Sequence, residues 1–467
     1  MTATLEADYL VVGSGAMGLA FTDVLLAETD ATFILVDRHH RPGGHWNDSY
    51  PFVRLHQPSS FYGVNSKALG SDQKDQTGWN AGLYELATGA EVCAYFDQVM
   101  NQQFLPSGRV RYFPMCEYQG DGRFVSRTSG REFTAKARRT VDATYMNVTV
   151  PSVQPPRYQV ANGVRCVPLN DLPRVESPPS GYVVVGAGKT GMDACLWLLA
   201  NEVEPSAITW IMPRDSWLLD RETIQPGAEF FDKTFGGISR QMEVIAGAGS
   251  IRELFEGVNT CGQLLRLDDD VWPTMYRCAT VTRAELEQLR RIQNVVRLGR
   301  IERIDLDEIV LEQGTVPTDP QRLHIDCSAD GLAHRPVAPV FAGDQITLQS
   351  VRTCQQVFSA AFVAHIESQY DDESKKNGLC TVVPHPNTDI DFLRTTLANN
   401  LNQIRWAQDP ALTAWLAGAR LDVFSRIGGE SAAADPASQA TLARFGEVLM
   451  GAIANLQKLL ADVDDAV

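Results

Sequence analysis

Short runs of apolar residues alternate with amphipathic stretches along the chain, and the first such pattern lies near its start. Residues 8–12 are mostly apolar, residues 13–18 are rich in glycine, an apolar-periodic stretch follows to residue 27, and residues 32–36 are apolar again. A continuous apolar run is typical of a buried parallel strand, and glycines let the chain turn tightly into a helix. The pattern predicts a strand, a glycine turn, a helix and a second strand.

The same pattern recurs in the middle of the chain. Apolar residues 182–185 precede a second glycine turn, a helical stretch runs to residue 199, and residues 207–212 are apolar. Such a unit brings backbone amides at a helix N-terminus against a pyrophosphate, so two copies predict two bound dinucleotides. The residues expected to hold the phosphates are Gly13, Gly15, Ala16, Met17 and Gly18 in the first copy, and Gly186, Gly188, Lys189, Thr190 and Gly191 in the second.

The two copies differ after their second strand. Asp37 follows the first copy, at the place where a carboxylate accepts both hydroxyls of an adenosine ribose. Arg214 follows the second copy, and a guanidinium there predicts a pair with the 2′-phosphate of NADPH. The alternative for Arg214 is a surface salt bridge to Asp215 or Asp220.

The whole pattern predicts an α/β fold with two Rossmann-like dinucleotide-binding domains, the second inserted in the first, plus a helical C-terminal extension. Residues 91–104 carry an apolar helical stripe that we expect to pack in the core, and residues 151–179, rich in proline and polar residues, predict an interdomain connection. The expected limits are residues 1–150 and 323–380 for the first dinucleotide-binding domain, 178–322 for the second with a helical insertion at 228–294, and 381–467 for the helical region.

Composition and charge exclude several classes of protein. Of the 467 residues, 44% are hydrophobic and 21% are charged, as in ordinary globular proteins rather than fibrous or disordered ones. The net charge of −16 repels nucleic acid and acidic membranes. No apolar run reaches the ~18 residues of a membrane span, and the first residues do not resemble a secretory signal. We therefore expect a cytoplasmic protein without a nucleic-acid or membrane partner.

The nine cysteines are scattered along the chain and form neither a C-x-x-C pair nor a zinc-ligand spacing. An odd, scattered set fits reduced thiols that pack as small apolar side chains. We therefore expect neither a disulfide scaffold nor a metal site.

Together these motifs resemble the two-dinucleotide-binding flavoproteins, most closely the class B flavin monooxygenases and bacterial FAD/NAD(P)-dependent oxidoreductases, over about residues 7–367. The resemblance implies FAD in the first domain and NADPH in the second. It assigns residues 43–46 to the flavin, a backbone group of Cys116 to adenine, and Gly343 with Asp344 to the ribityl chain. The residues that it adds for FAD are Arg38, Gly44, His45, Trp46, Cys116, Ala143, Gly343 and Asp344, and the one that it adds for NADPH is Trp217.

By the same resemblance, residues 50–58 lie beside the reactive edge of the flavin. Gln57 would hydrogen-bond a flavin hydroperoxide there, while His56 and Arg54 would bind substrate or cofactor phosphates, and these three are the expected catalytic residues. The alternative is a loop whose polar groups satisfy one another. For Trp46 the alternatives are a ring packed against the flavin and a side chain that only fills the core.

The resemblance implies an NADPH-dependent flavoprotein monooxygenase that acts on a small organic substrate with O2, and a homodimer is one expected assembly. Two departures from the family pattern leave alternatives open. The Phe-x-Gly segment followed by His is missing before the second glycine turn, because residues 158–172 contain no histidine, and Tyr145 replaces a glycine. The alternatives are an FAD/NAD(P)H-dependent reductase or dehydrogenase with an organic acceptor, and a nucleotide-binding protein without catalysis.

Overall fold

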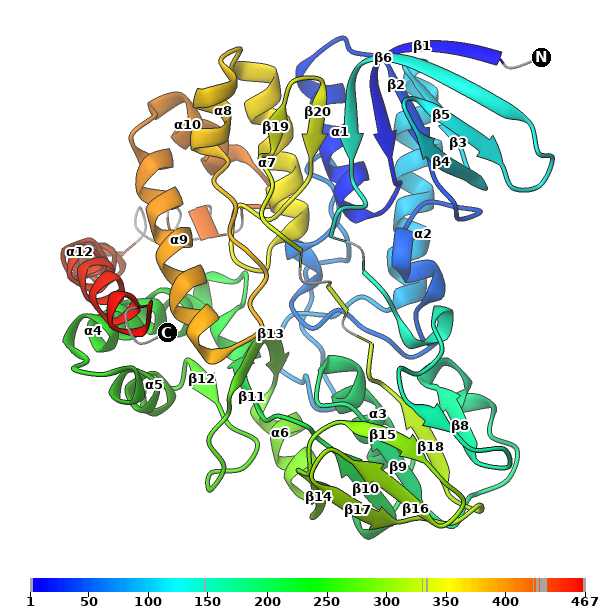
Figure 1. Cartoon of the computed structure of the whole chain (residues 1–467). Helices are drawn as coiled ribbons and strands as arrows, with labels where there is room; N and C mark the ends of the chain where they lie inside the picture. Colours follow the sequence, from blue (N-terminus) through cyan, green and yellow to red (C-terminus); the bar gives the residue numbers. More distant parts are fainter. Residues whose placement is uncertain are drawn as a thin grey trace.

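Each of the two sequence repeats builds the centre of its own parallel sheet. The computed structural model describes residues 3–146, 148–329, 331–332, 335–422, 424–425, 428 and 435–464. Both predicted repeats are confirmed as strand, helix and strand, and Figure 1 places their sheets in two separate halves of the molecule. Their elements are β1 (Ala3–Val12), α1 (Ala16–Glu28) and β2 (Phe33–Val36) in the first half, and β9 (Tyr182–Val185), α3 (Lys189–Ala200) and β10 (Ile208–Ile211) in the second.

The first sheet has the strand order β19-β20-β6-β1-β2-β3. β20 pairs in parallel with β6, so the chain returns to the first sheet after it has built the second one. This confirms the α/β fold in which one dinucleotide-binding unit is inserted in the other. The strands are β3 (Val110–Phe113), β4 (Cys116–Gly120), β5 (Arg123–Ser126), β6 (Glu132–Asp142), β19 (Phe341–Ala342) and β20 (Gln345–Thr347), with β4 and β5 as an antiparallel extension beyond β6.

Two helices complete the core of the first half. α7 (Gln356–Gln369) packs along α1, and both helices are buried over most of their length. α2 (Gly89–Val99) begins where Thr88 and Glu91 form a capping box, and it continues as a short π-helix to Phe104. The predicted apolar stripe of this helix is buried in the core, as expected.

The second sheet has the order β14-β10-β9-β18-β8, and its paired strands are parallel. β8 (Arg165–Pro168) lies within residues 151–179, so that segment is more than a connection. β18 (Leu323–Asp326) also belongs to this sheet, although the sequence predicts residues 323–380 as part of the first domain. The sequence pattern of a four-residue segment indicates a strand but not the sheet that the strand joins, because residues distant in the sequence decide the pairing. The domain limits themselves stay a prediction. The other strands here are β7 (Gln159–Val160), β14 (Asn294–Val296), β15 (Ile301–Ile304), β16 (Glu308–Leu311) and β17 (Gly314–Pro317).

The insertion after β10 and the C-terminal helices share one hydrophobic core. α12 (Pro436–Asp464) packs along α4 (Gly237–Gly247) and α9 (Asp389–Ala407), which Figure 1 shows at the left of the molecule. The expectation of a helical insertion at 228–294 is only partly right, because β13 (Met275–Val281) pairs there with β11 (Ser216–Asp220). The remaining elements are β12 (Leu264–Leu265), α5 (Ile251–Thr260), α6 (Arg283–Arg290), α8 (Glu373–Leu379) and α10 (Pro410–Gly418). No helix within the described residues combines the length and apolar character that crossing a bilayer needs.

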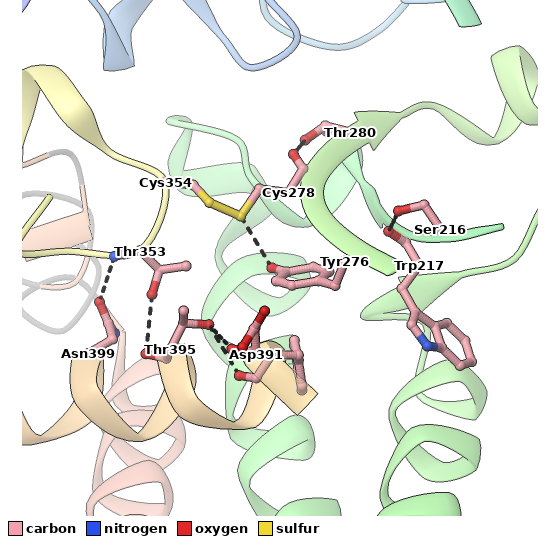
Figure 2. Close-up of a disulfide and its surroundings, with 11 residues drawn as sticks. Ser216, Trp217, Tyr276, Cys278, Thr280, Thr353, Cys354, Asp391, Thr395 and Asn399 are labelled. Carbon is pink, nitrogen blue, oxygen red and sulfur yellow. Dashed lines mark hydrogen bonds between the residues drawn. A yellow bond between two sulfur atoms is a disulfide. The ribbon is translucent and has the colours of Figure 1, made fainter. Parts of the chain in front are cut away.

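A disulfide joins Cys278 in β13 to Cys354 in the segment before α7 (Figure 2). The expectation of nine reduced thiols is therefore wrong for these two residues. They stand 76 residues apart, and only the fold brings them together, so their spacing in the sequence carried no signal. The free cysteines are Cys93, Cys116, Cys166, Cys195, Cys261, Cys327 and Cys380.

The buried side chain of Arg221 connects the two halves. Its Nε donates a hydrogen bond to the backbone oxygen of His56 at 3.0 Å, and its Nη1 donates to Asn80 Oδ1 at 3.1 Å. Its Nη2 lies 2.9 Å from Glu285 Oε2, at the start of α6. One guanidinium thus holds two first-half loops against the insertion.

We predict that Arg221→Ala lowers the free energy of unfolding by about 3–5 kcal/mol, because it leaves the half-buried Glu285 carboxylate without its ion-pair partner. Chemical denaturation followed by circular dichroism measures this change. Arg174→Ala is the matched control, since Arg174 is 76% exposed in a surface pair with Asp171, and it should cost less than about 1 kcal/mol. Equal costs for the two variants would contradict the prediction.

Candidate functional site

The first glycine turn is a close meeting of backbone segments. Gly13 has φ +100°, and a Cβ on Gly18 would lie 2.1 Å from the Gly13 oxygen. A Cβ on Gly44 would lie 2.9 Å from the Gly15 Cα, so the predicted segment 43–46 rests directly on the turn. Because the N-cap Gly15 has no side chain, the first N–H groups of α1 are left for an anion. This cradle fits a dinucleotide pyrophosphate.

Asp37 lies at the end of β2 and is held by its own chain. Its Oδ2 accepts hydrogen bonds from Ser14 N at 2.5 Å and Ser14 Oγ at 2.9 Å, and its Oδ1 accepts from His39 N at 2.8 Å. The second donor to Oδ1 is the His39 ring, whose Nδ1 lies at 2.9 Å. Burial alone would raise the pKa of Asp37, but these hydrogen bonds from His39 and Ser14 lower it below the usual value. Ribose hydroxyls would therefore have to displace the Ser14 hydroxyl or the His39 ring.

Two further residues predicted for FAD lie beside this turn. The Cys116 N–H donates to the Asp37 backbone oxygen at 2.8 Å, and the Ala143 N–H donates to the Val12 oxygen at 3.0 Å. Ala143 also packs on the turn, because a Cβ on Gly18 would lie 3.2 Å from the Ala143 Cβ. Two others point elsewhere: Arg38 is exposed, and the Met17 side chain is buried in the core.

The structure does not place Gly343 and Asp344 at the first glycine turn. These exposed residues form the hairpin between β19 and β20. Thr347 pairs with Asp142, which in turn pairs with Val12, so the end of β20 lies at the turn and its beginning lies away from it. The predicted ribityl contact is therefore not supported. Residues 348–355 leave β20 at the end of the strand that lies at the first glycine turn, and the Leu348 N–H donates there to the Asp142 oxygen at 3.0 Å.

His45 and Trp46 lie on a short 3₁₀ helix, Gly44–Asp48, beside the turn. The Trp46 Nε1–H donates to the Tyr62 hydroxyl at 2.7 Å, and its ring is part of the core, which fits the alternative of a core-filling side chain. Burial lowers the pKa of His45 to about 4. His39, in contrast, lies between Asp37 and Asp48 at 2.9 Å from each, and these carboxylates raise its pKa.

The second glycine turn opens onto a cavity of about 1210 Å³. A Cβ on Gly191 would lie 2.1 Å from the Gly186 oxygen, whereas a Cβ on Gly188 would meet nothing within 4 Å. Gly188 therefore faces open space at the N-terminus of α3. Of the residues predicted for NADPH, those that line this cavity are Gly186, Gly188, Lys189, Thr190 and Arg214. None of the described residues of the first glycine turn is part of its lining.

The alternative of a salt bridge from Arg214 to its acidic neighbours is wrong. Asp215 accepts two hydrogen bonds from Arg297, at 2.8 and 3.0 Å, and Asp220 accepts one from Arg283 at 2.8 Å. Arg214 instead lines the cavity, and its Nη2 donates to Asn387 Oδ1 at 3.3 Å. The cationic group predicted for a 2′-phosphate thus lies in the same cavity as the second glycine turn.

Two predicted residues of the second site have other roles. The Trp217 ring is fully buried and stacks on Phe255 with 5.0 Å between centroids, so a cofactor contact is not supported for it. Lys189 pairs with Asp193 one turn further along α3, and the Tyr50 hydroxyl donates to the same carboxylate. Tyr50 thereby ties the first half to α3.

The structure does not bring the three expected catalytic residues together at one place. His56 and Gln57 line the cavity, whereas Arg54 is exposed, forms a β-bridge with Thr88 and is not part of the lining. Burial first, and then the positive charges of Lys189 and Arg221, lower the pKa of His56 to about 3. Its buried Nδ1 has no hydrogen-bond partner among the described residues. At neutral pH the site therefore holds a neutral imidazole beside an amide.

Sequence reasoning missed several residues of the cavity. Tyr158 lines it and donates to Asp326 Oδ1 at 3.2 Å, so the segment that lacks the family histidine still borders the site. The spacing of the others gave no signal, because they come from separate strands and loops: Arg157, Arg277, Arg300 and Arg352. The described residues include no group of three or more His, Cys, Asp or Glu side chains placed to hold a metal ion.

We predict that three histidines have clearly different pKa values. His56 and His45 should stay neutral down to about pH 5, because burial lowers their pKa to about 3 and about 4, while His39 should keep its proton above pH 6.5. The unfolded chain binds more protons than folded His56 below pH 6.5, so this residue makes stability fall as the pH falls from there toward 3. Histidine NMR titrations, assigned with single His→Gln variants, measure the three values. An ordinary value near 6.5 for His56 would contradict the burial argument.

Comparison with known proteins agrees with this architecture. Residues 11–58 match the family model for an NAD(P)-binding Rossmann-like domain. The uncharacterized proteins Rv2000 of Mycobacterium tuberculosis (strain ATCC 25618 / H37Rv) and Mb2023 of Mycobacterium bovis (strain ATCC BAA-935 / AF2122/97) are each 55% identical over 425 residues, 91% of this chain and 79% of theirs. Cyclohexanone-bound cyclohexanone monooxygenase aligns with a TM-score of 0.51 and 14% identity over 80% of this chain and 88% of its own. The chain belongs to the family of these mycobacterial proteins, and it has the two-domain Rossmann fold of cyclohexanone monooxygenase.

Proposed function

We propose that this protein is an NADPH-dependent, FAD-containing monooxygenase that oxygenates a small organic substrate. One observation carries the proposal: Gly188, Arg214 and the His56–Gln57 pair, which come from different halves, line a single cavity. One solved structure with this fold is that of a monooxygenase with cyclohexanone bound, which supports this class of chemistry.

NADPH would bind at the second glycine turn. Its pyrophosphate would lie against the N-terminus of α3 at Gly188, where no protein atom approaches a Cβ position, and Arg214 would pair with the 2′-phosphate. FAD would bind at the first turn, where the N-cap Gly15 leaves the first N–H groups of α1 for its pyrophosphate. FAD supplies the acceptor for the nicotinamide hydride and the group that reacts with O2.

The residues of this chain then position the reactants and control water. His56 is neutral, so it offers one N–H donor and one acceptor nitrogen without adding a charge to the cavity. The Gln57 amide can donate and accept in the same region. Apolar side chains of the insertion and the C-terminal helices form another part of the wall and exclude water: Phe235, Ile238, Met242, Leu416 and Phe445. This wall fits an apolar organic substrate.

A second candidate is a reductase with the same cofactors that passes electrons to an organic acceptor. The absence of histidine from residues 158–172, where the family pattern places one, favours it. In this candidate the same cavity residues bind the acceptor, and O2 is not consumed in step with product.

Spectroscopy of one purified sample tests both candidates. A yellow protein with flavin absorbance, bleached by NADPH without O2, supports the shared cofactor scheme, and a colourless protein that cannot be loaded with FAD overturns it. O2 consumption equal to product formed, with little peroxide released, supports the monooxygenase. Reduction of an organic acceptor without O2 uptake selects the reductase instead.

We predict that Arg214 determines coenzyme choice. NADPH should be preferred over NADH by at least ~10-fold, and Arg214→Ala should abolish the preference, since a charge-assisted hydrogen bond contributes about 1.5–3 kcal/mol. The ratio of kcat/KM for anaerobic flavin reduction measures it. NADH is the internal control, because its KM should not change, and equal use of both coenzymes by the unaltered protein would remove Arg214 from this role.

We also predict that substituting two glycines of the second turn affects different properties, coenzyme binding for one and stability for the other. Gly188→Ala should leave the free energy of unfolding within about 0.5 kcal/mol, because its Cβ meets open space, yet weaken NADP+ binding by ~10-fold or more. Gly191→Ala should instead destabilise the fold by more than about 2 kcal/mol, because its Cβ would lie 2.1 Å from the Gly186 oxygen. Isothermal titration and chemical denaturation measure the two effects. NADP+ binding unchanged in Gly188→Ala would place the coenzyme elsewhere.

A further inference from the structure

The Cys278–Cys354 disulfide lies in the wall of the cavity. Both cysteines are part of its lining, and they join β13 of the insertion to residues 348–355, the segment that leaves β20 beside the first glycine turn (Figure 2). Cys278 is 6% exposed, while Cys354 is partly exposed. Because both residues line the cavity and Cys354 is the more exposed of the two, we expect a reagent in the cavity to reach the bond from the Cys354 side.

The backbone around the bond is irregular at both ends. Between the pairs Trp217–Tyr276 and Leu219–Thr280, three residues of β13 face a single residue of β11, so Cys278 is at the centre of a bulge. Cys278 has φ +56° and Cys354 has φ +54°, a left-handed conformation that residues with a Cβ seldom adopt. Bulges and left-handed residues of this kind cluster at functional sites, where they aim a side chain.

A hydroxyl group is placed to help the bond open. The Tyr276 hydroxyl lies 3.6 Å from Cys278 Sγ, and since a disulfide sulfur carries no hydrogen, the hydroxyl is the donor (Figure 2). Burial raises the pKa of Tyr276, so this hydroxyl keeps its proton at neutral pH. The Thr280 hydroxyl donates to the Cys278 backbone oxygen at 3.2 Å and steadies the bulge.

We propose that Cys278–Cys354 is a thiol–disulfide exchange site for a small organic thiol that enters through the cavity. The incoming thiolate attacks Cys354 Sγ and forms a mixed disulfide with it. The Cys278–Cys354 bond breaks, and its electron pair leaves on Cys278 Sγ as a thiolate, to which the Tyr276 hydroxyl donates. A second thiol molecule then displaces the first from Cys354, so that two thiols are oxidised to one disulfide and the cysteine pair takes up two electrons and two protons. The proposal rests on the cavity wall alone and does not depend on the proposed oxygenation.

The first test uses the unaltered protein and reduced glutathione as the probe. After quenching and alkylation, peptide mass spectrometry measures the fraction of Cys278 and Cys354 in the thiol form. The pair should open in the folded protein at a rate within ~10-fold of the rate in denaturant, because the cavity already exposes it. Opening more than ~100-fold slower in the folded protein would overturn the proposal, since a buried structural bond behaves that way.

The second test asks whether Cys354 is the sulfur under attack. Cys278→Ser leaves Cys354 as a thiol, and oxidised glutathione should modify it at least ~10-fold faster than Cys261 in the same molecule. Cys261 is the internal control, because it is also partly exposed but lies outside the cavity lining. Equal modification of the two would overturn the proposal.

The third test asks whether Cys278 is the leaving sulfur. Tyr276→Phe keeps the ring and removes the hydroxyl, so glutathione should open the bond ~10-fold more slowly, and Tyr276→Trp should not restore the rate. Thr280→Val serves as the control, since it removes a hydroxyl that bonds the backbone and not the sulfur. An opening rate unchanged in Tyr276→Phe would overturn the assignment of Cys278 as the leaving sulfur.

Discussion

Two close approaches of backbone to backbone set the geometry on which the rest of the structure depends. In each glycine turn, the oxygen of the first glycine occupies the space that a Cβ on the last glycine would need, at 2.1 Å in both Gly18 and Gly191. Each helix can therefore lie against its strand only with glycine at that position. The same approach points the N-termini of α1 and α3 at the carboxyl edge of their sheets, where an anion is stabilised by free N–H groups. Asp37 and Arg214 reach those edges because each follows the next strand of its unit.

This constraint is local, and for that reason the sequence predicted it. The first glycine turn belongs with Asp37 to one strand–helix–strand unit and the second belongs with Arg214 to the other, so the spacing within each unit places them. Features that depend on distant pairing could not be predicted. The Gly343–Asp344 pair fits the family motif, but it forms the hairpin before β20, at the end of this strand that lies away from the first glycine turn. Trp217 follows Arg214 closely, yet the stacking partner Phe255 from α5 holds it in the core.

The ion pairs of the charged residues also depend on partners that are distant in the sequence. Asp215 is the sequence neighbour of Arg214, but it pairs with Arg297, and this leaves the Arg214 guanidinium to the cavity. Further arginines reach the cavity from other strands and loops, although the chain as a whole has a net charge of −16. The lining holds more cationic side chains than carboxylates, which are those of Glu302, Glu312 and Asp422, so its field favours an anionic dinucleotide.

The two halves meet at the cavity through connections of different chemistry. Arg221 joins His56 and Asn80 to α6 by hydrogen bonds and an ion pair, which hold at any redox potential. The Cys278–Cys354 bond joins the insertion to the segment after β20, and that segment begins at the carboxyl edge of the first sheet. Arg221 also donates to the Thr280 backbone oxygen at 3.4 Å, so the polar connection holds β13 itself, two residues from Cys278. If the bond opens as proposed, the Arg221 contacts with Thr280, His56 and Asn80 keep β13 attached to the first-half loops, so the halves stay joined in either state of the cysteine pair.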